Sequence, residues 1–346
     1  MNKYFLILKG NNKELAKLEF EILYKTYFEE EIILKEEKNV IYSFETKKQI
    51  TKETEFLSRL TYTNYIGFFL DFYENYEDYK ENITRINIKK YQGLSFKMRI
   101  KKSRLGQKIN LTDKELATPI WKNLENPKVS IENPDVELNC LFIEEKTGFY
   151  LIEKIYENQK DYLRRMPQLR PIKMPYTLKS DMARASINLL GLKSGIVLDP
   201  FAGIGGLLLE AYDMNFKIIG NDINYNDLEY FKENFEYFYP GSTNNGKIIR
   251  TLADSQTQYL QNNSIDGIVS DIPYGKSSRK LGSDLYEKFL QSAKNYLKKN
   301  KKMIIIYANF VEFKNLAEKY FTIENEVDEY INKSMTRHIL ILKNNK

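Results

Sequence analysis

The 346-residue chain is poor in the residues that build crosslinks and metal sites, since it contains one cysteine and one histidine. Cys140 has no second cysteine for an internal disulfide, and together with His338 it cannot supply a Cys/His metal site. A single histidine also argues against Cys-His or Ser-His-Asp catalysis. The alternating apolar run at 136–143 predicts that Cys140 is a buried strand residue. Chemistry in this chain must therefore depend on carboxylates, aromatic rings, backbone groups or a cofactor.

Long apolar runs are missing as well. No stretch approaches the roughly 18 uninterrupted apolar residues of a membrane-spanning helix, and the apolar run near the N-terminus is too short for a signal peptide. A lone cysteine fits a reducing compartment. We therefore expect a soluble, cytoplasmic protein that has no membrane partner. The hydrophobic content of 42% is typical of a globular chain, and the length suggests two or three domains.

Acidic residues are absent between Glu81 and Asp113, where nine lysines and arginines occur. A second basic cluster spans residues 160–173 and is opposed only by Asp161. Basic runs attract phosphate backbones, although a single run can also be a solvated lysine-rich face. Two runs favour a nucleic-acid partner. The residues predicted to bind RNA in the first run are Lys97, Arg99, Lys101, Lys102 and Arg104.

The pattern of the chain changes at a segment with three prolines, which predicts a linker over 157–176. Before it, residues 1–46 predict strand, helix and strand, and residues 47–156 continue as mixed α/β. Thr112 and Glu115 form the signature of a capped helix within that part. After the linker, in 177–346, short apolar strands alternate with helices. This alternation predicts a doubly wound, mostly parallel sheet.

Four aspartates follow four successive predicted strands of the C-terminal part. They are Asp199, Asp222, Asp254 and Asp271. Ligands of such sheets bind beyond the carboxyl ends of the strands, so we expect these carboxylates to meet at one site. There Asp222 is placed to accept hydrogen bonds from ribose hydroxyls and Asp254 from an adenine amino group. The alternative is that the aspartates only cap helices or form turns.

The turn that follows the first strand is rich in glycine and begins with an aspartate. Leu208 stands where the nicotinamide-binding fingerprint has its third glycine, so that fingerprint fails. A helix N-terminus that binds pyrophosphate normally has no acidic residue beside it, and Asp199 would repel such a ligand. An acidic turn instead suits a cationic ligand such as S-adenosylmethionine, which carries an ammonium and a sulfonium.

The end of the fourth strand reads Asp-Ile-Pro-Tyr-Gly at 271–275, similar to the Asp/Asn-Pro-Pro-Tyr signature of amino-group methyltransferases. An exocyclic amine is a poor nucleophile because its lone pair conjugates into the ring. Asp271 and a backbone carbonyl can accept its two N–H groups and stabilise the charge that develops on nitrogen. Pro273 fixes the turn, and Tyr274 can stack on the base. Ile272 stands where the signature usually has its first proline.

Segments 198–211, 271–275 and 333–337, together with the approach segment 170–184, resemble archaeal tRNA guanine N2-methyltransferases that act on position ten. The resemblance covers nearly the whole chain. It implies a class I, Rossmann-like methyltransferase domain over 177–346, preceded by a ferredoxin-like segment over 1–46 and a THUMP-like RNA-binding domain over 47–156. In that family the N-terminal parts grip the tRNA, including its 3′ end, and no obligatory protein partner is expected.

The resemblance also assigns roles to individual residues. Catalysis falls to Asp271, Pro273 and Tyr274, and Lys276 and Arg279 in the following loop are candidates for RNA contact. Cofactor contacts fall to Asp199, Phe201, Gly203, Gly205, Asp222 and Asp254, with Thr177 and Leu178 at the methionine end. The remaining alternatives are an amino-methyltransferase that acts on another RNA or on DNA, and a non-catalytic RNA-binding protein with a degenerate methyltransferase fold.

Overall fold

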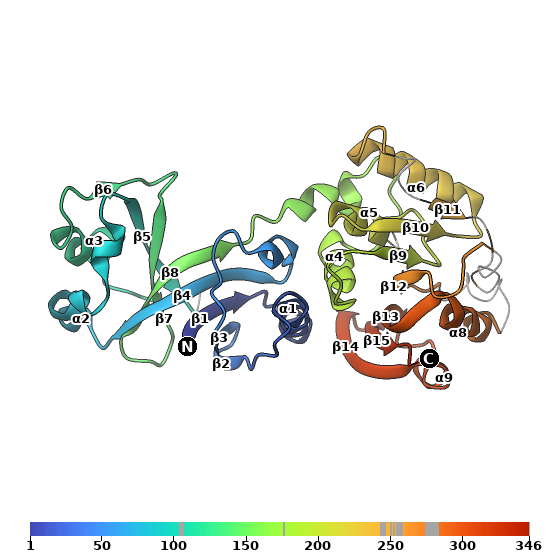
Figure 1. Ribbon diagram of the computed structural model, residues 1–346, viewed down its shortest axis with the longest axis horizontal. Helices are drawn as coiled ribbons and strands as arrows, with labels where there is room; N and C mark the ends of the chain where they lie inside the picture. Colours follow the sequence, from blue (N-terminus) through green and yellow to red (C-terminus); the bar gives the residue numbers. More distant parts are fainter. Residues whose placement is uncertain are drawn as a thin grey trace. The chain divides into compact units, whose positions relative to one another are not determined.

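The computed structural model describes residues 1–103, 107–175, 177–242, 247–249, 251, 253, 259–273 and 284–345 (Figure 1). The chain divides into two compact units by its internal contacts, and each unit has its own sheet. The first unit comprises Met1–Lys17 and Glu31–Gln159, and the second comprises Leu18–Glu30 and Lys160–Lys346. Within these ranges, no helix combines the length and the apolarity that crossing a membrane requires.

The first unit is built on an eight-stranded sheet in the order β2-β3-β1-β4-β8-β7-β5-β6. Neighbouring strands are antiparallel except that β5 runs parallel to both β6 and β7. Because β1 pairs with both β3 and β4, the sheet runs without a break across the boundary predicted near residue 46. The strands are β1 (Asn2–Leu8), β2 (Lys35–Lys38), β3 (Ile41–Thr46), β4 (Thr63–Tyr73), β5 (Ser95–Lys102), β6 (Lys128–Val129), β7 (Val136–Phe142) and β8 (Phe149–Glu157).

Short helices accompany this sheet, and the predicted capping box is confirmed in one of them. The Thr112 hydroxyl accepts a hydrogen bond from the Glu115 N–H, and the Glu115 carboxylate accepts one from the Thr112 N–H. Residues 55–59 form only a 3-10 turn. Cys140 is fully buried in the sheet, as predicted. The short helices are α2 (Tyr76–Asn82) and α3 (Asp113–Lys122), with 3-10 turns η1 (Glu55–Arg59), η2 (Ile83–Arg85) and η3 (Ile88–Tyr91). The longer helix α1 (Lys13–Phe28) begins in the first unit, and its residues from Leu18 onward are grouped with the second unit.

The second unit contains a seven-stranded sheet in the order β11-β10-β9-β12-β13-β15-β14. The five strands from β11 to β13 are parallel, and β15 is antiparallel to both of its neighbours. This confirms the predicted doubly wound, mostly parallel sheet. The strands are β9 (Ile196–Asp199), β10 (Lys217–Asn221), β11 (Lys247–Ile249), β12 (Ile265–Asp271), β13 (Leu297–Ala308), β14 (Thr322–Asn332) and β15 (Met335–Lys343).

Helices cover this sheet and complete its core. In α8, Phe289, Leu290 and Ala293 are fully buried in one cluster with residues of β9, β12, β13 and β15. Since β9, β10 and β12 are parallel, their carboxyl ends lie at one edge of the sheet, and the site is formed there. The helices are α4 (Ser180–Leu189), α5 (Gly206–Asp213), α6 (Tyr225–Phe238), α8 (Leu285–Tyr296) and α9 (Lys314–Ala317), with 3-10 turns η4 (Asp161–Arg165) and η5 (Pro167–Leu169).

Candidate active site

A cavity of about 500 Å3 opens at the carboxyl ends of β9, β10 and β12. The structure brings eight of the predicted cofactor and catalytic residues to its wall, and Gly205 is not among them. The eight are Thr177, Leu178, Asp199, Phe201, Gly203, Asp222, Asp271 and Pro273. Further wall residues come from the first turn of α5, from α6 and from the start of α8. Asp254 and Tyr274 lie outside the described residues.

Asp199 ends β9 and is almost fully buried. Its Oδ1 accepts hydrogen bonds from the Ser270 hydroxyl at 2.6 Å and from the Phe201 N–H at 3.1 Å. Burial raises the pKa of Asp199 to about 8, which these two hydrogen bonds oppose and the nearby carboxylates of Asp222 and Asp271 reinforce. Asp199 therefore holds the turn in shape, and its raised pKa means that a cationic ligand near it would favour the ionised form of this carboxyl.

Two glycines in this turn adopt positive φ for different structural reasons. Gly205 has φ 82°, and a Cβ there would lie 2.0 Å from the Phe231 ring, so this position tolerates only glycine. Gly203 has φ 49°, but a Cβ there would meet nothing within 4 Å. Gly205 thus lets the turn pack against Phe231 of α6. Gly203 lines the cavity and places no side chain in it.

Asp222 follows β10 and supports the same turn from the other side. Its Oδ2 accepts a hydrogen bond from the Gly203 N–H at 2.9 Å, and its Oδ1 accepts one from the Asn224 N–H at 2.9 Å. Burial raises the pKa of Asp222, and it also raises the pKa of Asp227 on α6. Each carboxylate oxygen can accept a second hydrogen bond, so Asp222 can still bind ligand hydroxyls.

Asp271 ends β12, where Ile272 donates a backbone hydrogen bond to the Ile306 carbonyl at 3.0 Å. Its Oδ1 is buried and has no hydrogen-bond partner among the residues that the structure describes. Burial raises the pKa of Asp271 to about 7, and the guanidinium of Arg337 opposes that rise. An unpartnered buried acceptor at a cavity wall is the group that an incoming N–H donor would satisfy. Two residues further on, the carbonyl of Pro273 accepts a hydrogen bond from the Tyr286 hydroxyl.

Arg337 and Glu329 flank Asp271, although the sequence assigned neither of them a role. Strand pairing places Arg337 of β15 opposite Ala308 of β13 and opposite Glu329 of β14. The Arg337 guanidinium lies 3.5 Å from the Glu329 carboxylate. Segment 333–337 is one of the segments that resemble the family, and this was the one feature of the sequence that could have pointed to a role for Arg337. Glu329 gave no signal, because only the pairing of β14 with β15 places it there.

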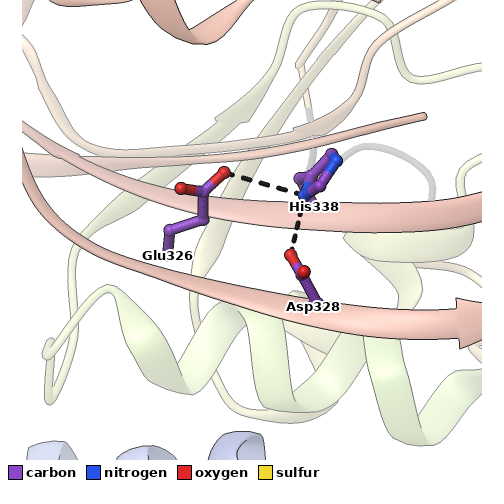
Figure 2. A group of neighbouring side chains, drawn as sticks. All are labelled: Glu326, Asp328 and His338. Carbon is purple, nitrogen blue, oxygen red and sulfur yellow. Dashed lines mark hydrogen bonds and ion pairs between the residues drawn. The ribbon is translucent and has the colours of Figure 1, made fainter. Parts of the chain in front are cut away.

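His338, the next residue on β15, takes part in a separate cluster with Glu326 and Asp328 (Figure 2). Its Nδ1 lies 2.7 Å from Asp328 and 3.7 Å from Glu326. Glu326 also pairs with Lys314 at 2.5 Å and accepts a hydrogen bond from the Tyr307 hydroxyl. Because a lysine already neutralises Glu326, we interpret this cluster as an ion-pair network between strands and not as a metal site.

The first unit carries a second hollow, of about 760 Å3. Lys97, Arg99 and Lys101 line it, because alternate residues of β5 point to the same face. By that alternation Lys102 lies on the opposite face, and it does not line the hollow. The other charged residues of the wall are Lys52, Lys154, Glu132, Glu137 and Glu157. Of the remaining predicted RNA contacts, Arg104, Lys276 and Arg279 lie outside the described residues.

The cations of this hollow have partners within the first unit. Lys97 donates a hydrogen bond to the Ile131 carbonyl at 2.7 Å, and Lys101 pairs with Glu157 at 2.9 Å. Arg99 lies 3.6 Å from Asp113. All these side chains are at least partly exposed, so the pairs are weak and a polyanion can replace them.

Comparison with known proteins places these features in context. The family described as RMKL-like, methyltransferase domain, matches residues 167–339, and the family described as DNA methylase matches residues 3–233, a span that ends before Asp271. The tRNA (guanine(10)-N2)-dimethyltransferase of Methanothermobacter thermautotrophicus is 29% identical over 290 residues, which cover 82% of this chain and 83% of that protein. The probable tRNA (guanine(10)-N2)-dimethyltransferase of Methanothermococcus thermolithotrophicus is 30% identical over 171 residues, 47% of this chain and 97% of that protein.

Among solved structures, TrmN from Thermus thermophilus is similar in fold. The two structures align with a TM-score of 0.52 at 15% sequence identity, and the alignment covers 99% of each chain. At this identity the likeness concerns the fold alone. It agrees with the methyltransferase-like α/β fold that the sequence predicts for the second unit.

Proposed function

Since the chain belongs to the family of RMKL-like methyltransferase domains, we propose that it methylates the exocyclic N2 amine of a guanosine in tRNA with S-adenosylmethionine as donor. One observation carries this proposal: Asp271 presents a buried, unpartnered carboxylate oxygen at the wall of an acidic cavity. The relatives named tRNA (guanine(10)-N2)-dimethyltransferase support guanosine at position ten as the target and the addition of one or two methyl groups.

The residues of the cavity fit this cofactor. Four aspartates line it, and within the described part of the chain none of them forms an ion pair. Burial raises the pKa of all four, so a cationic ligand, which favours their ionised forms, gains from binding beside them. Asp222 retains acceptor capacity for ribose hydroxyls, and Gly203 leaves room for close approach. The four are Asp199, Asp222, Asp227 and Asp271. When bound, S-adenosylmethionine supplies an electrophilic methyl group and leaves as a neutral thioether.

Asp271 prepares the amine for attack. Its free Oδ1 accepts an N–H of the target base, which holds the nitrogen lone pair away from that acceptor and stabilises the positive charge that develops on nitrogen. The sulfur leaves as a neutral thioether, so the reaction releases one proton, which the positively charged, methylated nitrogen loses to Asp271 or to solvent. That nitrogen is strongly acidic, so no strong base is required at the site. We also propose that Pro273 fixes this turn and that Tyr274 stacks on the base.

We further propose that the first unit holds the tRNA. The hollow lined by Lys97, Arg99 and Lys101 has five cations and three carboxylates on its wall, so its net charge attracts phosphates. In this proposal residues 47–156 form a THUMP-like domain behind a ferredoxin-like segment at 1–46, and 157–176 link them to the methyltransferase domain. Lys102, Arg104, Lys276 and Arg279 add phosphate contacts. The enzyme acts in the cytoplasm without an obligatory protein partner.

The proposal is tested by incubating the full chain with labelled S-adenosylmethionine and unmodified tRNA, rRNA or DNA, followed by mass analysis of the nucleosides. We expect N2-methylguanosine or N2,N2-dimethylguanosine in tRNA alone. Methylated adenine or cytosine in DNA would favour the DNA methylase alternative instead. Binding of tRNA without any methyl transfer would favour a non-catalytic RNA-binding protein.

A further inference from the structure

Arg170, between η5 and α4, is a buried cation in the second unit that no described carboxylate neutralises. Its side chain is among the largest fully buried ones, with a residue exposure of 1%. The Nε donates a hydrogen bond to the Arg165 carbonyl at 2.9 Å, and one terminal nitrogen lies 3.5 Å from the Ser180 hydroxyl. The other terminal nitrogen, Nη1, is buried and has no hydrogen-bond partner in the described part of the chain.

The neighbouring Arg165 shows how a buried arginine is normally satisfied. It binds both carboxylate oxygens of Glu210, at 2.9 and 2.7 Å, and both of Asp213, at 2.8 Å. Arg184 also pairs with Asp213, at 2.8 Å. These two acids are therefore already occupied by other arginines. Burial lowers the pKa of Arg170 to about 10, and the Arg165 charge adds to that effect while Glu210 opposes it.

The free nitrogen of Arg170 lies directly behind the cavity wall. A Cβ on Gly206, the first residue of α5, would lie 3.1 Å from Arg170 Nη1 and 3.1 Å from Thr177 Cγ2. Gly206 and Thr177 both line the cavity. The Thr177 hydroxyl oxygen is also buried and has no hydrogen-bond partner. The Thr177 hydroxyl and the first turn of α5 thus lie on one stretch of the wall, and the Arg170 guanidinium lies just behind that stretch, so an anion is favoured there.

We propose that Arg170 and Thr177 form the subsite for the carboxylate of the methionyl group of S-adenosylmethionine. The aspartates of the cavity attract the cations of the cofactor, but they cannot hold its one anionic group. Arg170 supplies the missing positive charge, and the absence of a side chain on Gly206 lets that charge act on the ligand. This inference rests on the proposed function, since it assumes that the cavity binds S-adenosylmethionine.

The test compares two ligands by calorimetry on the full chain. One is S-adenosylhomocysteine, and the other is its decarboxylated analogue, S-adenosyl-3-thiopropylamine, which keeps the ammonium and lacks only the carboxylate. Arg170→Met should weaken binding of S-adenosylhomocysteine by about tenfold to a hundredfold, since a buried charge just behind the wall acts on the ligand through a medium of low dielectric constant. Binding of the decarboxylated analogue should change less than about twofold.

Two further variants control for charge and for position. Arg164→Met removes a cation from the same segment, but its side chain is 67% exposed, so the affinities for both ligands should stay unchanged. Arg170→Lys keeps a cation and should restore part of the affinity for S-adenosylhomocysteine alone. If Arg170→Met does not fold, Thr177→Val replaces it, with a smaller but equally selective loss expected for the ligand that carries the carboxylate.

Equal losses for both ligands would overturn the inference and make Arg170 a structural residue only. An unchanged affinity for S-adenosylhomocysteine in Arg170→Met would overturn it as well. If the wild-type chain binds neither ligand, the proposed cofactor and hence the proposed function are wrong. The comparison therefore separates failure of this subsite from failure of the function.

Discussion

The cavity of the second unit and the hollow of the first unit, both formed by described residues, differ in how their charged side chains are buried and paired. In the cavity of the second unit, Asp199, Asp222 and Asp271 are largely shielded from solvent, and burial raises the pKa of each. In the hollow of the first unit, Lys97 and Lys101 lie near the surface and already have partners in the chain. The cavity thus holds buried carboxyl groups without ion-pair partners in the described part of the chain, whereas the hollow presents exposed cations that already have partners.

This difference indicates different kinds of ligand. Unpaired buried carboxylates are costly unless a cation or an N–H donor satisfies them, so the cavity is prepared for a small ligand of defined shape. Exposed ion pairs contribute little stability and exchange readily, so the hollow suits a polyanion that binds through many replaceable contacts. Single changes should therefore have large effects in the cavity and small effects in the hollow.

The largest effect is expected at Asp271. Asp271→Ala should lower single-turnover methylation by about a hundredfold to a thousandfold, because an acceptor aimed at developing charge contributes about 3 to 4 kcal/mol. Glu157→Ala removes an acid from the hollow and is the matched control, with turnover expected close to wild type. Affinity for S-adenosylhomocysteine should hardly change in either variant. Near-normal methylation by Asp271→Ala would contradict the catalytic assignment.

The two glycines of the turn after β9 should differ in stability. Gly205→Ala forces a methyl group into the Phe231 ring at positive φ, and we expect a loss of about 2 to 4 kcal/mol in the free energy of unfolding. Gly203→Ala meets open space and should cost only about 1 kcal/mol for its φ. Urea denaturation of the full-length variants measures both. Equal losses would show that the turn is packed differently.

Turnover should rise with pH through about 7, because Asp271 accepts an N–H only when it is ionised and its pKa is raised to about 7. The positive charge of Arg337 lowers that pKa, so Arg337→Met should move the midpoint of the pH profile upward by about one unit. Arg337→Lys keeps the charge and should leave the midpoint near its original value. A midpoint that does not move in Arg337→Met would show that Asp271 does not limit the rate at low pH.

The smallest effect per residue is expected in the hollow. Replacing Lys97, Arg99 and Lys101 together by alanine should weaken tRNA binding and flatten its salt dependence by about 0.7 to 0.9 in log–log slope for each lost phosphate contact. Lys102→Ala, on the other face of β5, should change the slope less. Filter binding over a range of salt concentrations measures this. An unaltered slope in the triple variant would mean that tRNA does not bind there.

Local sequence signals predicted much of the second unit. Short apolar strands that end in aspartate placed Asp199 and Asp271 correctly, because each such strand is buried from end to end and its polar residue marks the edge. The sequence did not reveal β4, whose central residues Gly67, Phe68 and Phe69 break the alternation of an exposed strand. The first half of β13 is equally hard to predict, because its lysines and asparagine at 298–302 resemble a loop, although the strand begins at Leu297.

The supporting residues of the site were harder to predict than the site itself. Glu329 and Arg337 come near Asp271 only through the successive pairing of four strands, β12 with β13, β13 with β15 and β15 with β14. Arg170 was visible as part of a basic cluster, which suggested a surface that binds RNA. Its burial could not be predicted, because it depends on Gly206 having no side chain and on Arg165 occupying the nearby acids.

The central claim is that an exocyclic guanine amine receives the methyl group, and one substitution in the substrate tests it directly. A tRNA transcript with inosine in place of guanosine at position ten lacks only the 2-amino group at that nucleoside. We predict that this transcript binds the protein as tightly as the unaltered one and accepts no methyl group there, whereas the guanosine transcript is methylated. Equal incorporation of label into both transcripts would contradict the claim.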